Sequence, residues 1–374
     1  MLKLILLLTP VYVTLFWALV LIFDRSRKHS PKIFLGKFMS VAFIIYLSHF
    51  FYFTGQYEIY LYLDSIYTMA SLSVYPLYYI YVRMLTVDSG FSPSVHLKYL
   101  ALPAAVFLLH LTGYLIMDKS DAIYYLSTVL PGVYPGQYIT GYMKIIYNLF
   151  RIVFIFQAII YLYMNYRLIS SHNEKLQELY SNIERRNLDW VQFFNFSLAI
   201  TSVSSVLAVL IGRDMFAASE IHLAVPSVIF SLMLFIIGLL GNTQREVYTE
   251  QQNPAEMTVK ENPPDRLDKM MEDLFEKRLI FKDTDLKIWD VCNMLGTNRT
   301  YVSRIINNYY GRNFCNHVNF YRVEYAKKLI RQNRGLTNQE VAELSGFGSV
   351  NSLYRAFTSI ENKTVGEFRK TPSS

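Results

Sequence analysis

Long apolar stretches separated by short polar connections fill the first two thirds of the chain. Each stretch is about twenty residues long, which is the helix length needed to cross a bilayer core of roughly 30 Å. Most of them lack the polar face that a soluble helix of this length carries. The pattern predicts seven membrane-spanning helices, at Leu4–Phe23, Phe34–Phe53, Ile66–Leu85, Leu97–Met117, Lys144–Tyr166, Val191–Gly212 and Ile221–Leu240.

Basic residues in the connections predict the orientation of these spans. The connections after spans one, three and five carry most of them: Arg25, Arg27, Lys28, Lys32, Lys37, Arg83, Lys98, Arg167, Lys175, Arg185 and Arg186. The opposite side carries Lys119, Lys144 and Arg213. Because positive residues stay in the cytoplasm, we expect a multi-pass inner-membrane protein with its amino terminus outside. The first stretch has an alternative interpretation as a signal sequence, but it is long and no cleavage site follows it.

The membrane part contains candidate ligand-binding residues. Its many tyrosines are explained either by an interfacial aromatic belt or by an aromatic pocket beneath the loop Asp118–Tyr142. Arg151 lies within span five, where it either extends to the outer interface or binds an acidic ligand group. His49 and His110 are helix-packing residues or pocket residues. The chain shows no catalytic or metal-ligand pattern, so we predict no enzyme activity, cofactor or metal.

Two soluble segments connect the membrane part to the rest of the chain. Between spans five and six, Arg167–Trp190 has apolar residues at helical spacing among charges, which predicts an amphipathic helix or a solvated extension of span five. Contact of this segment with the carboxyl-terminal domain is one interpretation. Residues 242–265 are polar and end in two prolines, which indicates a linker. The predicted domains are therefore 1–241, the linker 242–265, and 266–374.

The last domain has the composition of a soluble protein with a basic surface. Between Arg299 and Lys370, 12 basic residues accompany 5 acidic ones, so the net charge of this segment equals the +7 of the whole chain. A concentrated positive charge is typical of a surface that meets phosphate. Cys292 and Cys315 both lie in this domain, and we interpret them as small buried residues without a disulfide.

Helical periodicity in this domain forms a repeated pattern. A helix in LKIWDVCNMLG, with Asp283 or Asp285 as its N-cap, is followed by a turn at Gly296 and a second helix capped by Thr297. After a long helix in HVNFYRVEYAKKLIRQ, the pattern returns: Thr337 caps a helix, Gly346 turns, and SVNSLYRAFTS forms the last major helix. Helix, glycine turn and helix is the arrangement that places a second helix in the major groove. The predicted fold class is thus all-α, with a seven-helix bundle and two helix-turn-helix units.

These blocks resemble the AraC/XylS family of bacterial transcription regulators over about a hundred residues. The resemblance implies two recognition helices that enter successive major grooves about 34 Å apart. The matching base-facing positions are Arg299, Thr300, Ser303 and Arg304 in the first helix, and Val350, Asn351, Tyr354 and Arg355 in the second. The chain departs from the family at Asn362 and Val365, where Gly and Pro are usual. Asn362 keeps the turn if it adopts left-handed backbone conformation.

The sequence therefore predicts a membrane-bound, one-component transcription regulator, a sensor that binds promoter DNA. Its expected partners are double-stranded DNA, the lipid bilayer and an unknown small ligand, with RNA polymerase and a second copy of the chain as further candidates. One alternative is a membrane transporter or enzyme with a fused regulatory domain. Another is a scaffold whose helix-turn-helix units bind protein. The ligand, the target promoters and the direction of regulation are open at this point.

Overall fold

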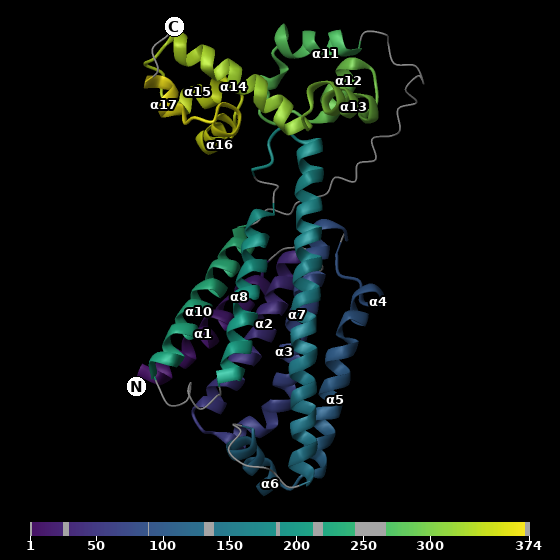
Figure 1. The fold of residues 1–374 in the computed structure, drawn as a ribbon, viewed down its shortest axis with the longest axis vertical. Helices are drawn as coiled ribbons and strands as arrows, with labels where there is room; N and C mark the ends of the chain where they lie inside the picture. Colours follow the sequence, from purple (N-terminus) through teal and green to yellow (C-terminus); the bar gives the residue numbers. More distant parts are fainter. Residues whose placement is uncertain are drawn as a thin grey trace. The chain divides into compact units, whose positions relative to one another are not determined.

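The computed structural model describes residues 2–24, 30–88, 90–130, 138–184, 188–211, 220–243 and 267–370, without the side chains of 138–140, 208–211 and 220–225. The described chain is all-α, as predicted. It divides into two compact units (Figure 1): Met1–Ile169 with Asp189–Val247, and Ser170–Leu188 with Tyr248–Ser374. The predicted linker from residue 244 onward, and the basic residues Arg25, Arg27, Lys28, Arg185, Arg186 and Arg213, lie outside the described residues.

The first unit contains a long helix at each of the seven predicted spans. These are α1 (Leu2–Ile22), α2 (Pro31–Phe53), α3 (Tyr57–Thr86), α5 (Ala101–Ile116), α7 (Tyr138–Leu179), α8 (Asp189–Ile211) and α10 (Glu220–Thr243). Short turns α4 (Pro93–His96) and η1 (Leu97–Leu100) precede α5, and α6 (Lys119–Tyr124) and η2 (Tyr125–Val129) follow it. In sequence order, α1 packs on α2, α2 on α3 and α3 on α5, while α10 returns to α1. At that last contact Gly238 leaves room for Trp17, since a Cβ would lie 2.3 Å from the indole ring.

Six stretches of the described chain are helical, long enough and apolar enough to cross a membrane: Leu2–Ile22, Pro31–Phe53, Pro93–Ile116, Gly141–Leu179, Asp189–Leu207 and Pro226–Thr243. The predicted third span is a helix, α3, but it does not meet this standard of apolarity. Its buried side includes Asp64, several serines, and tyrosines such as Tyr60, Tyr78 and Tyr81 that are at most 2% exposed. Polar groups of this kind are tolerated because they face other helices.

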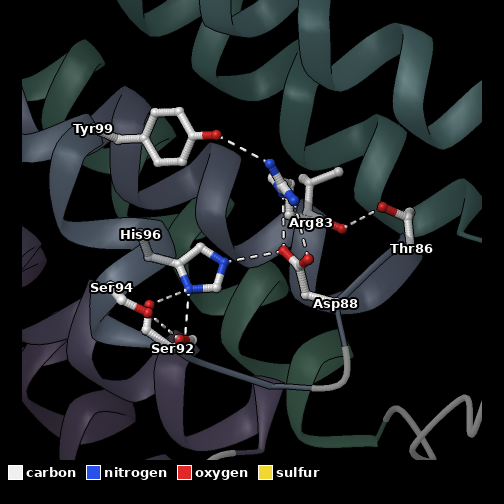
Figure 2. A network of polar contacts seen from close by, with 8 residues as sticks. Arg83, Thr86, Asp88, Ser92, Ser94, His96 and Tyr99 are labelled. Carbon is white, nitrogen blue, oxygen red and sulfur yellow. Dashed lines mark hydrogen bonds and ion pairs between the residues drawn. The ribbon is translucent and has the colours of Figure 1, made fainter.

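A polar network closes the end of α3 onto the turns that follow (Figure 2). The Arg83 guanidinium donates two hydrogen bonds to the Asp88 carboxylate, at 2.9 and 3.0 Å, and a third to the Tyr99 hydroxyl at 3.0 Å. His96, only 1% exposed, lies 3.0 Å from the same carboxylate through Nε2. Although burial alone would raise the pKa of Asp88, the hydrogen bonds from Arg83 and His96 hold it below its usual value. The network joins the connection after α3 to the start of α5.

The connection between the fifth and sixth spans is an extension of span five, one of the two interpretations of its sequence. Helix α7 runs without a break to Leu179, and its residues from Ser170 onward belong to the second unit. The charged residues after Leu179 do not form a further helix up to Glu184. Helical periodicity continues past the end of α7, so the sequence pattern alone overstates its length.

The second unit is built from two small cores joined by one long helix. The first half contains α11 (Leu267–Glu276), η3 (Ile280–Lys282), α12 (Ile288–Leu295) and α13 (Arg299–Tyr310). The second contains α15 (Asn338–Leu344), α16 (Val350–Glu361) and α17 (Val365–Lys370). Helix α14 (Phe314–Gln332) contributes Val318 to the first core, and Val323, Ala326 and Ile330 to the second. Each half is thus a helical hairpin with its own apolar centre.

Candidate DNA interface and candidate ligand cavity

The first helix-turn-helix unit consists of α12 and α13. Gly296 ends α12 with φ +62°, a conformation that costs glycine little. The N-cap of α13 is Asn298, whose side chain accepts from the Tyr301 backbone N–H, so the prediction of Thr297 is wrong by one residue. The reason is that the Thr297 N–H bonds back to the Cys292 carbonyl and still belongs to the turn.

The N-cap predicted for α12 is also wrong. The helix begins after Lys287, whose N–H donates to the Asp290 carboxylate at 2.8 Å, whereas Asp283 and Asp285 lie in the preceding turn. The helical spacing of apolar residues in LKIWDVCNMLG predicts a buried stripe at Ile288, Val291, Cys292 and Leu295, and the structure confirms that all four are buried. Cys292 and Cys315 are both free and buried.

The residues predicted to face DNA lie on the solvent side of α13. Thr300 and Arg304 are exposed and lie one turn apart, while Arg299 and Ser303 are half-buried. The Arg304 guanidinium lies 5.5 Å from the centre of the Tyr301 ring on its own helix. The exposed pair is therefore presented by a helix whose other face, at Val302 and Ile306, is fully buried.

The second unit, α15 and α16, has the same layout. Thr337 caps α15 as predicted, in a reciprocal capping box with Glu340. Gly346 makes the turn with φ +86°, and Ser349 caps α16. Asn362 ends α16 with φ +54°, which confirms that the family's glycine turn is kept with asparagine in its place.

On α16, Asn351, Tyr354 and Arg355 are exposed. Val350 is half-buried and packs against the second core. The Tyr354 hydroxyl accepts a hydrogen bond from the Asn338 side chain at 2.8 Å, and the Asn338 oxygen accepts from Arg369 at 3.0 and 3.2 Å. This chain of contacts fixes the position of the Tyr354 ring.

Several basic residues of this domain have partners inside it. Lys327 lies within 2.8 Å of both Glu324 and Glu361, and Arg369 donates to the carbonyls of Arg334 and Leu336.

A buried arginine links the two halves. Arg322, on α14 and 1% exposed, donates from Nε to the Phe281 carbonyl and from Nη2 to the Asp283 carbonyl, both at 2.7 Å. Burial lowers its pKa to about 10, so it stays charged at neutral pH. Gly346 of the second unit also packs against this backbone segment, so closely that a Cβ at position 346 would lie 2.5 Å from the Phe281 carbonyl oxygen. These contacts fix the two helix-turn-helix units to each other.

The segment between α7 and α8 adds a further set of contacts within the second unit. The Glu184 carboxylate accepts hydrogen bonds from the Ser349 hydroxyl at 2.7 Å, the Ser352 hydroxyl at 2.7 Å and Arg355 Nη2 at 2.9 Å. Burial opposes its ionisation, but these donors hold the pKa of Glu184 below its usual value of 4.5. Glu184 is thus a carboxylate at the amino-terminal end of α16.

The first unit contains a partly open cavity of about 580 Å³. Its walls are mainly aromatic and aliphatic, with hydroxyls from Ser71, Ser197 and Thr201. Arg151 and His49 both line it, and Arg151 is the one charged side chain other than histidine among its described walls. No acidic partner of Arg151 is found among the described residues, and its guanidinium lies 5.9 Å from the Tyr147 ring centre. The volume lies within the range of ligand sites, roughly 300–1,000 Å³.

His110 lines a separate, much smaller cavity of about 10 Å³, beside a buried acid. The Asp64 carboxylate accepts from the Tyr60 hydroxyl at 2.7 Å and the Tyr114 hydroxyl at 2.6 Å, and His110 Nε2 lies 3.5 Å from it. The other His110 nitrogen is 2.9 Å from the Ser65 hydroxyl. The loop predicted to cover a pocket packs here through Tyr125 and Leu126, whereas residues 131–137 lie outside the described part.

Sequence reasoning missed Asp64, Glu184 and Arg322. Asp64 falls between the predicted second and third spans, although its spacing from Tyr60 places both on one helix face. Arg322 lies among buried apolar positions of α14, which is a usable signal. Glu184 had none, because its role comes only from contacts distant in sequence. The described residues contain no cluster of His, Cys, Asp or Glu that could hold a metal ion.

A family model described as a helix-turn-helix domain matches residues 291–371, which span both hairpins from α12 to α17. Comparison with curated proteins and with solved structures gave no match. The matched segment agrees with the resemblance to AraC-type regulators that its sequence shows. The carboxyl-terminal part of the chain is therefore a helix-turn-helix, DNA-binding domain of a transcription regulator.

Proposed function

We propose that this protein is a membrane-bound, one-component regulator that senses a ligand and binds promoter DNA sequence-specifically through both helix-turn-helix units. The observation that carries this proposal is the pair of exposed, DNA-competent side chains on each recognition helix. These are Thr300 and Arg304 on α13, and Asn351 and Arg355 on α16. The positive-inside pattern supports a cytoplasmic location for this domain, in an inner membrane.

The chemistry of the exposed side chains suits base reading. Arginine can form two hydrogen bonds with a guanine edge, asparagine can do so with adenine, and the threonine methyl can contact thymine. Arg299, Ser303 and Tyr354, the other predicted base-facing residues outside the core, flank these positions and add further contacts to the DNA. Val350 contributes mainly to the core, so the second helix reads fewer bases than the first.

Ligand sensing is supported by the cavity in the first unit. An arginine without an acidic partner at membrane depth is costly, and a ligand anion would offset that cost. The apolar walls suit a hydrophobic body. The ligand we propose is therefore an acidic amphiphile, and it acts through different affinities for two states of the helix bundle.

Genome-wide crosslinking and sequencing of bound DNA tests the DNA-binding part. The full-length protein in its native membrane is compared with an Arg304→Ala/Arg355→Ala variant and with Arg278→Ala, an exposed arginine away from both recognition helices. We expect discrete sites that persist in Arg278→Ala and vanish in the double variant. Sites that persist in the double variant would contradict the assignment of the recognition helices.

Photo-crosslinking tests the ligand class. A diazirine-labelled long-chain carboxylate and the matching alcohol are added to the protein in proteoliposomes, and labelled peptides are mapped by mass spectrometry. We expect the carboxylate to label cavity peptides, with competition by the unlabelled acid, and Arg151→Gln to abolish the preference over the alcohol. Arg167→Gln, on an exposed position of the same helix, is the control. Equal labelling by acid and alcohol in the wild type would contradict an acidic ligand.

A transporter with a fused regulatory domain is the second candidate, because Asp64 and His110 form a buried acid–histidine pair within the helix bundle. Such pairs occur in proton-coupled carriers. Substrate-dependent proton flux in proteoliposomes that disappears in Asp64→Asn would favour this function over sensing.

A further inference from the structure

The amino-terminal end of the second recognition helix is occupied by a side chain of the same molecule. Glu184 accepts from two hydroxyls and one guanidinium of α16, at Ser349, Ser352 and Arg355. Ser349 is the N-cap of this helix, so the carboxylate also lies near the positive end of the helix dipole. The Glu184 carboxylate thus occupies the hydrogen-bond donors and the positive helix end that would otherwise be available to a DNA phosphate.

The segment Gln177–Glu184, here called the docking segment, is held against the domain along its length. Leu179 packs against the first core, and the Gln177 side chain accepts from Asn313 at 2.9 Å. The Ser181 N–H donates to the Leu286 carbonyl at 3.1 Å, and its own hydroxyl accepts from Arg322 at 3.1 Å. Ser181 is 2% exposed. The docking segment therefore contacts both helix-turn-helix units, and these contacts hold the Glu184 carboxylate in place.

The packing near Glu184 is close. A Cβ on Gly348, in the turn before α16, would lie 2.6 Å from the side-chain amide nitrogen of Asn182, so the Asn182 side chain packs directly against this turn. DNA contacting this end of α16 would meet both the docking segment and its negative charge. Like charges at such distances repel. Engagement of α16 with DNA therefore requires the docking segment to leave.

We propose that the docking segment is an internal competitor of DNA, which holds the second recognition helix in an inhibited state. The proposal rests on the proposed function, because it assumes that α16 binds DNA. The segment continues α7 and leads toward α8, so a change in either helix acts on it through the chain itself. Ligand binding in the first unit then regulates transcription by releasing α16, while α13 keeps its exposed face in both states.

A charge-neutral variant tests the competition. Full-length Glu184→Gln in lipid nanodiscs is compared with Glu174→Gln, which removes the same charge from an exposed position of the same connection. The probe is a fluorescent 24-base-pair duplex of random sequence, and the dissociation constant is measured by anisotropy. We expect Glu184→Gln to bind about tenfold more tightly than Glu174→Gln, since several charge-assisted hydrogen bonds no longer oppose DNA.

A disulfide that holds the docking segment against α16 tests whether the segment must leave before DNA binds. In Asn182→Cys/Gly348→Cys, oxidation joins the docking segment to the turn before α16, and the single variants serve as controls. The native thiols of Cys292 and Cys315 do not interfere, because both are buried and burial raises the pKa of each to about 11. We expect oxidation of the double variant to reduce DNA affinity and a reductant to restore it.

The outcomes separate the two proposals. Equal affinity of Glu184→Gln and Glu174→Gln, or full DNA binding by the oxidised double variant, overturns internal competition and leaves the proposed function standing. Absence of DNA binding by the wild type, Glu184→Gln and the reduced double variant overturns both.

Discussion

The two helix-turn-helix units share one layout but differ in what their recognition helices touch. Both begin at a polar N-cap, Asn298 or Ser349, and both end in a left-handed residue, Gly311 or Asn362. The exposed Arg304 of α13 lies over a tyrosine of its own helix, whereas Arg355 of α16 holds Glu184 from another part of the chain. The same fold thus presents one open helix and one occupied helix.

This difference teaches that the capacity to read DNA and access to DNA are set by different parts of the sequence. Capacity comes from local features: caps, a glycine turn and a helical stripe of exposed residues. Access to α16 depends on a segment more than 160 residues earlier in the chain, between two predicted spans. A sensor that acts on that segment therefore needs no change in the recognition helices themselves.

We expect the largest loss of stability from a substitution at Arg322, because this residue connects the two helix-turn-helix units. Arg322→Met leaves the buried Phe281 carbonyl and the Asp283 carbonyl without their donor, and we expect a loss of about 3 kcal/mol in the free energy of opening of both cores. Hydrogen exchange with mass spectrometry on the full-length protein measures it. Arg331→Met, an exposed arginine of the same helix, is the control. A loss confined to one core would show that Arg322 does not couple the two units.

The next largest effect is a difference in DNA affinity between substitutions at the two recognition arginines, Arg304 and Arg355. Arg304→Ala should weaken binding to a duplex selected from a random pool by about 1–3 kcal/mol. Arg355→Ala should cost less, because the same change also weakens the hold of Glu184 on α16. In a Glu184→Gln background this compensation is gone, so the loss at Arg355 should grow while that at Arg304 stays constant. A double-mutant cycle by anisotropy measures the coupling. Additive losses would mean that Glu184 does not compete for Arg355.

Acid should loosen the first half more than the second. His317 is 1% exposed, and burial, followed by the charge of Arg312, lowers its pKa from 6.5 to about 4. Between these values the unfolded state binds a proton that the folded state does not, so stability falls as the pH drops from 6.5 toward 4. At pH 5 the loss is on the order of 2 kcal/mol.

Hydrogen exchange at pH 7 and pH 5, corrected for intrinsic rates, measures this loss in peptides of each core. The second core is the internal control, because it contains no histidine. His317→Leu removes the titrating group from its place among Phe275, Tyr310 and Tyr321, and should flatten the response of the first core. An acid response that survives this substitution would assign it to another group.

How far the sequence predicts these features depends on the range of the interactions. The sequence correctly predicts Thr337 as a cap, because its capping box with Glu340 is local. It places the cap of α13 one residue too early, at Thr297, because a hydrogen bond from the Thr297 N–H to the Cys292 carbonyl keeps Thr297 in the turn. The buried stripe of α12 follows from periodicity alone. Nothing local distinguishes Glu184 from Glu174 or Glu178, so its contact with α16 could be found only in three dimensions. The third span is predicted from the length of its apolar stretch, but the serines, tyrosines and Asp64 of α3 suit a helix that lies inside the bundle.

The smallest expected effect concerns the one base-facing residue that α15 positions. Asn338→Ala removes the hydrogen bond to the Tyr354 hydroxyl and the acceptor of Arg369, while leaving the cap at Thr337 in place. We expect DNA affinity to fall by about 0.5–1 kcal/mol, because the ring of Tyr354 is then free to adopt several rotamers before binding. Gln339→Ala, the exposed neighbour, should have no effect. The loss should be larger in a Glu184→Gln background, where α16 is released, than in the wild type, where the docking segment already limits what the second helix contributes. An equal loss in both backgrounds would mean that α16 engages DNA whether or not Glu184 is present.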